Sequence, residues 1–454
     1  MRRRLPVLSL LLLSAFACDG PVPAGDAGRP DAGDSAPDAG PPPPDVQGLS
    51  GPEVANGVPP SDPLYEGQQR FLWDAFGTER VSGLPPAAFF EGLLAEDPAL
   101  FDAYGFLDDP ADDFPVGFKR GLEDPTQVSV TCALCHVAEL PDGRLWFGAP
   151  NVGLRWPAFL LFADDRWTAD GNAPFLSALD RAKLAELGPG RVGAESSSYE
   201  QAVPADYPTY FSLGQRTSLN YLGTGGDART EIYLSVYSAG AGNPNPRDAE
   251  VPWPSAARLD PMIAFMSALE PPAAPPQDAA SVSAGRAVYE REGCDGCHHV
   301  DDPSALGVVT YDADPVGAER RPGEHPDFPN GSIRTSRLHR VLIDGDEMGG
   351  GGPDEGLADL FRFITRNGLR TRLSDGYRAA DLRMVWFTAP FLHNGSVPTL
   401  EDLLRPPAER PVTFERHGFE VDTAAPGNDN GGHTFGTTIT EEERTALAAY
   451  LRSL

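Results

Sequence analysis

The chain carries one five-residue pattern twice, as Cys132-Ala-Leu-Cys135-His136 and as Cys294-Asp-Gly-Cys297-His298. Both copies read C-x-x-C-H, the pattern by which haem c is attached to a protein. Thiols three positions apart lie about one helical turn from each other, and they reach the two vinyl groups of one porphyrin as thioethers. The histidine beside the second thiol then lies under the ring as an axial iron ligand. The sequence therefore predicts two covalently bound haem c groups, with His136 and His298 as proximal ligands.

Two other uses of these cysteines compete with that prediction. A zinc site made from both pairs leaves the two trailing histidines unexplained and joins pairs that lie far apart in the sequence. Two structural disulfides are the second alternative, but C-x-x-C bridges are usually redox-active. A disulfide-dense scaffold is excluded, since the 454 residues include five cysteines. Haem c is the favoured interpretation.

The N-terminus indicates export. Three arginines at 2–4 precede an apolar run over 5–16, which is too short to span a bilayer and is typical of a signal peptide over 1–17. Cys18 follows directly and fits the lipidated cysteine of a bacterial lipoprotein. The residues at 15–17 also fit ordinary signal peptidase, which leaves Cys18 as a free thiol. We expect a periplasmic or cell-envelope protein whose membrane contact is a lipid anchor at Cys18.

A polar stretch follows over 18–62, rich in Pro, Gly and Asp, with eight acidic side chains and one basic side chain. It has too few large apolar residues to offset the entropy cost of ordering, so we expect a disordered tether. The whole chain has 36 basic and 66 acidic side chains and a formal charge of −30. This charge argues against a nucleic-acid partner, because the chain and a phosphate backbone repel each other.

The rest of the chain is long enough for two domains. The segment Ala264–Leu269 resembles Ala449–Leu454, and a Pro-rich stretch over 271–276 follows the first copy. We therefore place an N-terminal haem c domain at 63–276 and a C-terminal haem c domain at 277–454.

Helix signals flank the second motif. A helix is expected over 283–293, with Ser283 as its N-cap, directly before the motif. A second helix is expected at the C-terminus, where Thr440 and Glu443 form a capping box ahead of an apolar face. We expect these two helices to pack together. The predicted fold is mainly α with long irregular loops, in two tandem cytochrome c-type haem domains.

The sixth iron ligand is predicted to differ between the two haems. No histidine lies between His136 and His298, and the methionines there, Met262 and Met266, lie on a helical apolar pattern that indicates core packing. The N-terminal iron is therefore expected to be open to peroxide or dioxygen. For the C-terminal iron, His393 and His433 are the candidates, and spacing does not choose between them. The other four histidines of the C-terminal region are read as non-ligands: His299, which adjoins the proximal ligand, and His325, His339 and His417.

Several segments resemble a known family. They are the two haem motifs, Tyr104–Phe106 and Pro115–Phe118 before the first motif, Asp206–Pro208, the stretch APFLHNGSVPTLEDLL that begins at Ala389, and Asn428–Gly436. Over roughly 65–454 the chain resembles the di-haem cytochrome c peroxidase and MauG superfamily, and within it the rubber oxygenase-like subgroup.

The resemblance implies two facing, mainly helical domains with one reactive haem and one electron-transfer haem. In the rubber oxygenase-like branch, a second histidine on the C-terminal haem comes from a segment similar to Gly427–Gly436, which implies His433 as the sixth ligand and puts His393 near the haem interface. The classical peroxidases have a methionine on that iron and a distal histidine on the N-terminal haem. The chain departs from both patterns, since it has no methionine after Met384.

The expected activity is that of a peroxidase-like di-haem oxidoreductase, with peroxide or dioxygen and a redox partner or organic substrate. The alternatives are a non-catalytic electron-transfer cytochrome and a dioxygenase that cleaves a polyisoprene-like substrate. Glu231 is a candidate distal acid, with a solvated glutamate as the alternative. A calcium site near Gly427–Gly431 is an alternative to plain turn chemistry there. Five tryptophans are candidates for an electron bridge, with core packing as the alternative: Trp146, Trp156, Trp167, Trp253 and Trp386.

Overall fold

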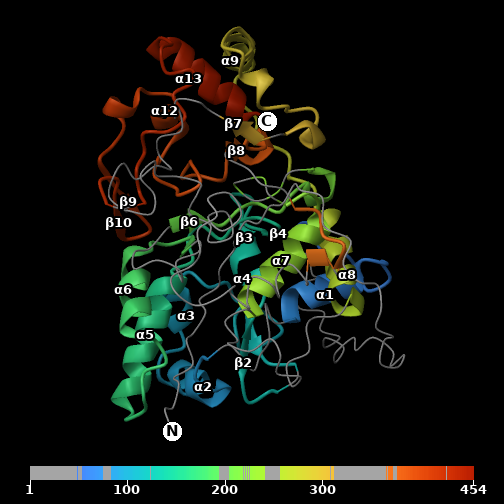
Figure 1. Ribbon diagram of the computed structural model, residues 1–454, viewed down its shortest axis with the longest axis vertical. Coiled ribbons are helices and arrows are strands. Elements are labelled where there is room, and N and C mark those ends of the chain that lie inside the picture. Colours follow the sequence, from blue (N-terminus) through green and yellow to red (C-terminus); the bar gives the residue numbers. More distant parts are fainter. Residues whose placement is uncertain are drawn as a thin grey trace.

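The computed structural model shows a mixed helical protein with small sheets (Figure 1). It describes Leu49 and the residues 54–74, 83–122, 124–193, 204–217, 219, 221, 223, 225–240, 256–306, 308–310, 364–365, 367–371, 376–425 and 427–454. The expected signal peptide, Cys18, His325, His339 and Trp253 lie outside the described residues, as does most of the expected tether.

The helices are mostly short. Their bounds are α1 Tyr65–Trp73, α2 Ala87–Glu96, α3 Leu100–Ala103, α4 Ala133–His136, α5 Trp156–Ala169, α6 Ala178–Glu186, α7 Ala228–Gly240, α8 Ala256–Ser267, α9 Ala279–Arg291, α12 Leu400–Leu403 and α13 Glu441–Arg452. Within the described part of the chain, none of the helices has both the length and the apolar character that crossing a bilayer requires.

Small antiparallel sheets stand between the helices, each with two strands. The pairs are β1 Phe118–Arg120 with β2 Val128–Val130, β3 Val137–Glu139 with β4 Leu145–Phe147, β5 Arg191–Gly193 with β6 Pro204–Asp206, β7 Val308–Thr310 with β8 Gly376–Arg378, and β9 Thr413–Arg416 with β10 Phe419–Asp422. These strands have three or four residues, too few for an alternating pattern to stand out in the sequence, which explains why a mainly α fold with loops was expected.

Two helix pairs repeat the same close packing. Helix α1 packs on α8 and helix α9 packs on α13, in separate parts of the molecule (Figure 1). A Cβ added to Gly67 of α1 would overlap the carbonyl of Pro261 in α8, and one added to Gly285 of α9 would overlap the carbonyl of Ala446 in α13. The contacted positions 261 and 446 differ by 185, the same offset that separates the similar segments at 264 and 449. The sequence echo thus marks a repeated structural unit.

The caps of these helices confirm one prediction and correct another. Thr440 and Glu443 form the predicted capping box of α13. Helix α9 begins at Ala279, four residues before the expected start, and its N-cap is Asp278, whose side chain accepts a hydrogen bond from the backbone N–H of Ser281. Ser283 lies inside the helix. The prediction was wrong because an aspartate just after a Pro-rich stretch is an equally good cap.

Buried side chains form three clusters. The first and second clusters combine residues from the N-terminal part, up to Leu269, and the first also includes Met384. The third cluster lies between α9, α12 and α13. Segment 268–278 between α8 and α9 contains no regular element, and the expected boundary near 277 falls at its end.

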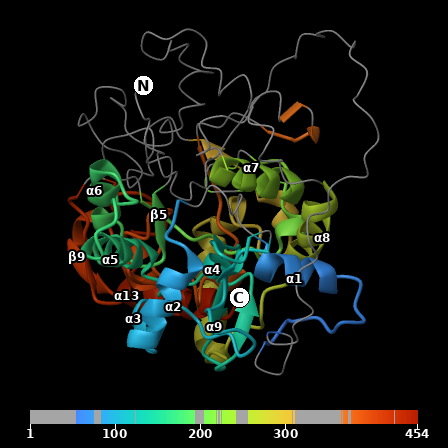
Figure 2. The ribbon, with the colours of Figure 1, turned by 90° about the horizontal axis from the view of Figure 1, so that it is seen from below.

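One C-terminal element lies against the N-terminal part. The β9–β10 hairpin lies beside α5 and α6 in both views (Figures 1 and 2). Its Phe419 ring would lie 2.7 Å from a Cβ placed on Gly188, just after α6. Its Arg416 side chain is buried and donates a hydrogen bond of 2.7 Å to Asp206 at the end of β6. The hairpin therefore joins distant parts of the sequence through buried contacts.

Candidate haem sites

The second motif lines a cavity of about 300 Å³. Helix α9 ends at Arg291, and Gly293 then takes a left-handed conformation with φ of 70°. This turn leads into a short 3-10 helix, Cys294–Gly296 (η5). The cavity is lined by Cys294, Cys297 and His298, together with the two candidate ligands His393 and His433.

His298 is held in an orientation that suits an iron ligand. Its Nδ1 lies 2.9 Å from the carbonyl oxygen of Ala380. Because a carbonyl only accepts hydrogen bonds, Nδ1 carries the proton and Nε2 keeps a free lone pair. Burial lowers the pKa of His298, so the imidazole is neutral at physiological pH, as metal binding requires.

The His433 ring lies opposite His298, with 6.2 Å between the two ring centroids. Two imidazoles that bind one metal ion, each at about 2.0–2.1 Å, have ring centres roughly 6 Å apart. The Nδ1 atom of His433 is buried and lacks a hydrogen-bond partner among the described residues. Burial, the nearby His298 and Arg410 lower the pKa of His433 to about 3, which keeps it neutral. This pair of side chains fits a haem iron between them.

The loop that carries His433 is fixed by Arg410. The guanidinium of Arg410 donates to the carbonyl oxygens of Gly432 and His433, at 2.5 and 3.0 Å. His433 itself has φ of 54°, in the left-handed region that few non-glycine residues adopt. The backbone here is held in an unfavourable conformation by buried hydrogen bonds, which is common at binding sites.

His393 lines the same cavity but has other neighbours. Its ring centroid lies 5.5 Å from that of Tyr377 and 6.0 Å from that of Tyr221. Its backbone carbonyl accepts a hydrogen bond from the N–H of Asp206. His299 and His417 are exposed. The structure therefore brings His433 to His298 and places His393 among tyrosines at the contact with β6.

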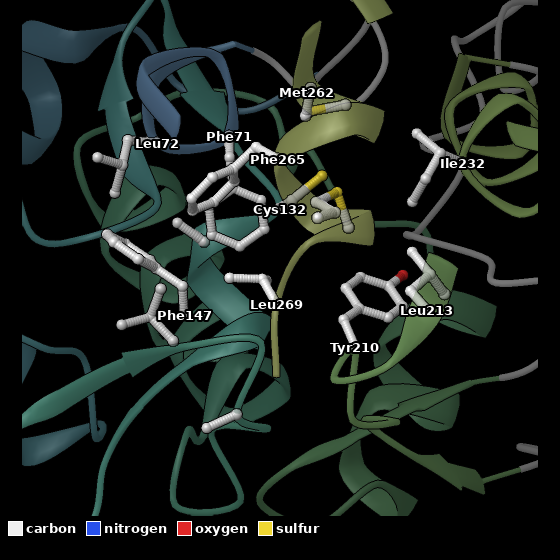
Figure 3. Close-up of a cluster of buried hydrophobic side chains, with 14 of the residues drawn as sticks. Phe71, Leu72, Cys132, Phe147, Tyr210, Leu213, Ile232, Met262, Phe265 and Leu269 are labelled. Carbon is white, nitrogen blue, oxygen red and sulfur yellow. The ribbon is translucent and has the colours of Figure 1, made fainter. Parts of the chain in front are cut away.

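The first motif is more deeply buried than the second. Cys132 is the N-cap of α4, which ends at His136. Figure 3 shows Cys132 among side chains of the first cluster, near Phe265 and Leu269. Gly117 packs against the backbone N of Leu134 so closely that a Cβ would overlap it, and its φ of 76° is left-handed. A glycine is required at 117 for the motif to keep this position.

His136 has the same kind of hydrogen bond as His298. Its Nδ1 lies 3.1 Å from the carbonyl oxygen of Pro208, which again leaves Nε2 with a free lone pair. Burial lowers the pKa of His136 to about 3. Tyr210 stacks on the imidazole with 3.8 Å between ring centroids. Among the described aromatic and histidine rings, the neighbours of His136 are Tyr207 and Tyr210, and neither is a histidine.

Cys132, Cys135, Cys294 and Cys297 form no disulfide with one another in the structure. Burial raises the pKa of Cys132 and Cys135 to about 12 and that of Cys294 to about 11. In the described part of the chain, no group of three or more His, Cys, Asp or Glu side chains could hold a metal ion. The zinc and disulfide alternatives therefore find no support.

The side chains near Gly427 that were considered as an alternative for calcium take part in hydrogen bonds with the surrounding chain. Asn428 accepts a hydrogen bond from Arg191 and donates to the carbonyl of Asp422, and Asn430 donates to the carbonyl of Pro411. Asp429 accepts from the N–H of Gly431, which is ordinary turn chemistry.

Met262, Met266 and Glu231, which the sequence analysis weighed as ligands or as a distal acid, are all buried. Met262 and Met266 are 3% and 0% exposed in the first cluster, which confirms that they pack in the core. Glu231 is 6% exposed, so the interpretation of a solvated glutamate was wrong. Burial and the negative charge of Glu231 raise the pKa of Tyr210, which shows that the carboxylate lies near the tyrosine stacked on His136.

The described tryptophans pack in different clusters of buried side chains. Trp156 is buried in the second cluster, and Trp167 packs on Phe89 with 5.3 Å between ring centroids. Trp146 and Trp386 pack against the first cluster. Trp386 directly follows Val385, which lines the cavity of the second motif. Since Trp386 itself packs against the first cluster, it lies between that cluster and the cavity.

Residues 376–415 match the family model described as RoxA-like, cytochrome c-like. The match confirms, for this segment, the resemblance to the rubber oxygenase-like cytochromes and supports haem c as the cofactor of a haem-dependent oxidoreductase. Two uncharacterised proteins of Sinorhizobium fredii are also similar. One, y4iJ, is 40% identical over 116 residues, or 20% of this chain and 19% of the relative. The other, y4iM, is 54% identical over 52 residues, or 12% of each. The chain thus spans a fifth or less of the length of these relatives.

Two solved structures resemble parts of the chain. Hydrazine synthase of Kuenenia stuttgartiensis has 19% identity and a TM-score of 0.30, over 55% of this chain and 72% of that one. A MauG-like protein associated with microbial copper homeostasis has 21% identity and a TM-score of 0.34, over 66% of this chain and 87% of that one. TM-scores this low establish neither a common fold nor a common activity.

Proposed function

We propose that the protein is an exported di-haem c-type oxidoreductase. In this proposal, the haem attached at Cys132 and Cys135 activates peroxide or dioxygen, and the haem attached at Cys294 and Cys297 transfers electrons. The observation that carries the proposal is the difference between the two proximal histidines: His298 faces His433 at 6.2 Å, whereas the described ring neighbours of His136 are tyrosines.

Haem, when bound, supplies an iron centre that exchanges electrons and reacts with oxygen species where a coordination position is open. Around His433 the residues close the second site. His298 and His433 would both ligate the haem iron, and Arg410 fixes the backbone of His433, so the site would suit electron transfer rather than binding of peroxide.

Around His136 the residues support a reactive site. The apolar first cluster excludes water from the side of Cys132. Glu231 is a buried acid whose charge acts on Tyr210, and it is our candidate for holding and moving a proton there. Trp386, which lies between the two regions, is the preferred candidate for an electron bridge.

The repeated helix pair supports two haem domains. Helices α1 and α8 precede and follow the first motif, and α9 and α13 precede and follow the second, with the same glycine-to-carbonyl contact in each pair. We propose that the boundary lies near 277 and that the tether at 18–62 and a lipid at Cys18 hold the domains at an envelope membrane.

The test is a set of spectra on the purified mature protein. We expect mass spectrometry to find two haem groups per chain, and electron paramagnetic resonance to show one high-spin and one low-spin iron at rest. Stopped-flow mixing with hydrogen peroxide or oxygen should change only the high-spin signal. Two low-spin irons that do not react would contradict the proposal and would indicate a non-catalytic electron-transfer cytochrome instead. Oxygen uptake with a polyisoprene latex would identify the dioxygenase alternative.

A further inference from the structure

The side chain of Arg410 is buried against the loop that carries His433. It is 4% exposed. Its Nη1 donates hydrogen bonds to the carbonyl oxygens of Asn430 and Gly432, the second at 2.5 Å. Its Nη2 donates to the carbonyl oxygen of His433 at 3.0 Å. One guanidinium thus holds three carbonyl groups of the short stretch 430–433.

The other N–H groups of Arg410 contact the C-terminal end of α12. Nη2 also donates to the carbonyl of Leu403, at 3.1 Å, and Nε donates to that of Arg405, at 3.2 Å. A guanidinium has five N–H groups, so each one of Arg410 has a main-chain carbonyl as its partner. Leu403 lines the cavity of the second motif. Arg410 therefore ties the His433 loop to a wall of that cavity.

Few other hydrogen bonds hold residues 430–433. Within the described part of the chain, their backbone makes no hydrogen bond with other backbone groups, and they belong to no helix or strand. The backbone N–H of Gly431 donates to the side chain of Asp429, and the side chain of Asn430 donates to the carbonyl of Pro411. The carbonyl groups of the loop are therefore held mainly by one side chain.

A lysine could not form the same set of bonds as Arg410. Its ammonium has three N–H groups on one nitrogen, whereas the guanidinium presents five in a planar fork. Asp402 and Asp429 act on Arg410 through their charge, while its hydrogen bonds go to carbonyl groups. The shape of the donor group, rather than its charge, therefore fits this position.

We propose that Arg410, through its five hydrogen bonds, keeps His433 on the second haem iron and so keeps that iron closed to peroxide and other external ligands. Arg410 is thus a positioning residue that decides which haem reacts. The inference rests on the proposed function, in which His298 and His433 both ligate this iron. His433 has an unfavourable φ of 54°, so without these bonds its loop should relax and its imidazole should leave its place opposite His298.

The test compares Arg410→Lys and Arg410→Gln with the wild-type holoprotein. Arg410→Lys keeps the charge and loses the fork, and Arg410→Gln loses both. Electron paramagnetic resonance at rest reports the low-spin irons, and titration of the reduced protein with carbon monoxide counts the irons with an open axial position. The wild type should bind about one carbon monoxide per chain. Both variants should bind about two and show no low-spin iron.

Arg444→Lys is the matched control. Arg444 lies in α13, is also buried, and donates from Nε to the carbonyl of Leu404 at 3.1 Å. Its hydrogen bonds within the described chain do not reach residues 430–433. The control therefore loses the same kind of buried fork close to α12, and it should keep one low-spin iron and bind about one carbon monoxide.

A second measurement does not depend on haem. Hydrogen–deuterium exchange, followed by mass spectrometry, reports how firmly the peptide over 428–436 is held. Its exchange should be at least about tenfold faster in both Arg410 variants than in the wild type, because hydrogen bonds from a charged group are lost. Arg444→Lys should exchange this peptide at the wild-type rate.

Three outcomes would overturn the assignment. A low-spin iron that remains in both Arg410 variants shows that His433 stays on the iron without the guanidinium. A low-spin iron in Arg410→Lys but not in Arg410→Gln shows that charge, rather than the five bonds, keeps the ligand. Unchanged exchange over 428–436 in both variants shows that the loop does not depend on Arg410, whatever the haem content. A wild type without any low-spin iron is distinct, because it removes the proposed function as well.

Discussion

The guanidinium of Arg416 donates a 2.7 Å hydrogen bond to the carboxylate of Asp206, which stands 210 positions earlier in the chain. Both side chains are buried, and Arg191 adds a second cation, with its Nε 3.4 Å from the same carboxylate oxygen. Arg191 also donates 2.7 Å to the carbonyl of Gly395. One aspartate therefore holds β5, β6, β9 and the segment around Gly395 together.

Asp206→Asn should strongly destabilise the protein. The change leaves two buried guanidinium groups without a counter-charge, and removal of one partner of a buried pair costs about 3–5 kcal/mol. Urea unfolding followed by circular dichroism measures the loss. Asp102→Asn, at an exposed position of α3, is the matched control and should change stability by less than about 0.5 kcal/mol. Equal stabilities of the two variants would contradict the assigned role.

His433→Ala should convert one low-spin haem iron to high spin. The change removes the imidazole whose ring lies 6.2 Å from that of His298. Electron paramagnetic resonance and the optical spectrum report the spin state directly. His393→Ala is the control from the same cavity and should leave the spin state unaltered. The reverse result, in which only His393→Ala changes the spin state, would make His393 the ligand.

Gly117→Ala should reduce haem attachment at the first motif. Its Cβ would overlap the backbone N of Leu134, and its φ of 76° is left-handed, so the motif has to shift. Gly143 has nearly the same conformation, with φ of 74°, but open space around it. Gly143→Ala should therefore cost only the conformational strain of about 1–2 kcal/mol and retain haem. Mass spectrometry of the peptide that contains Cys132 measures the attached fraction.

Glu443 should make the C-terminal helix pair sensitive to acid. Hydrogen bonds from Arg291 and from the cap residue Thr440 lower the pKa of Glu443 from 4.5 to about 2. A carboxyl whose pKa is lowered on folding stabilises the protein fully above pH 4.5, and the contribution is lost as pH falls through about 2. Melting temperatures at pH 5 and pH 2 should therefore differ less in Glu443→Gln than in the wild type. Glu442→Gln, beside it on the exposed surface, should behave like the wild type.

The features that the sequence predicted correctly are local. The capping box at Thr440 and the packing of α9 on α13 follow from short patterns, because caps and apolar faces are formed by neighbours in the chain. The echo between 264–269 and 449–454 had the right register, as the contacts of Gly67 and Gly285 show.

The features that the sequence could not predict depend on long-range contacts. Nothing around Glu231 distinguishes a buried acid from a solvated one, since burial is decided by α7 packing on other elements. The same holds for Arg410, which is of a common surface residue type until the fold buries it. Spacing alone left His393 and His433 equivalent. The family resemblance favoured His433, and the ring positions in the cavity show His433, not His393, facing His298.

The hairpin at 413–422 lies late in the sequence, and this position decides when its contacts with Asp206 can form. Asp206 leaves the ribosome 210 residues before Arg416. At roughly 5–20 residues per second, this delay is about 10–40 s. During that time Asp206 and Arg191 have each other but lack the β9–β10 hairpin, Asn428 and the Gly395 carbonyl. The first haem motif is thus synthesised well before the residues that complete the contacts of Asp206 and Arg191. These last contacts of the fold can form only after almost the whole chain has been synthesised.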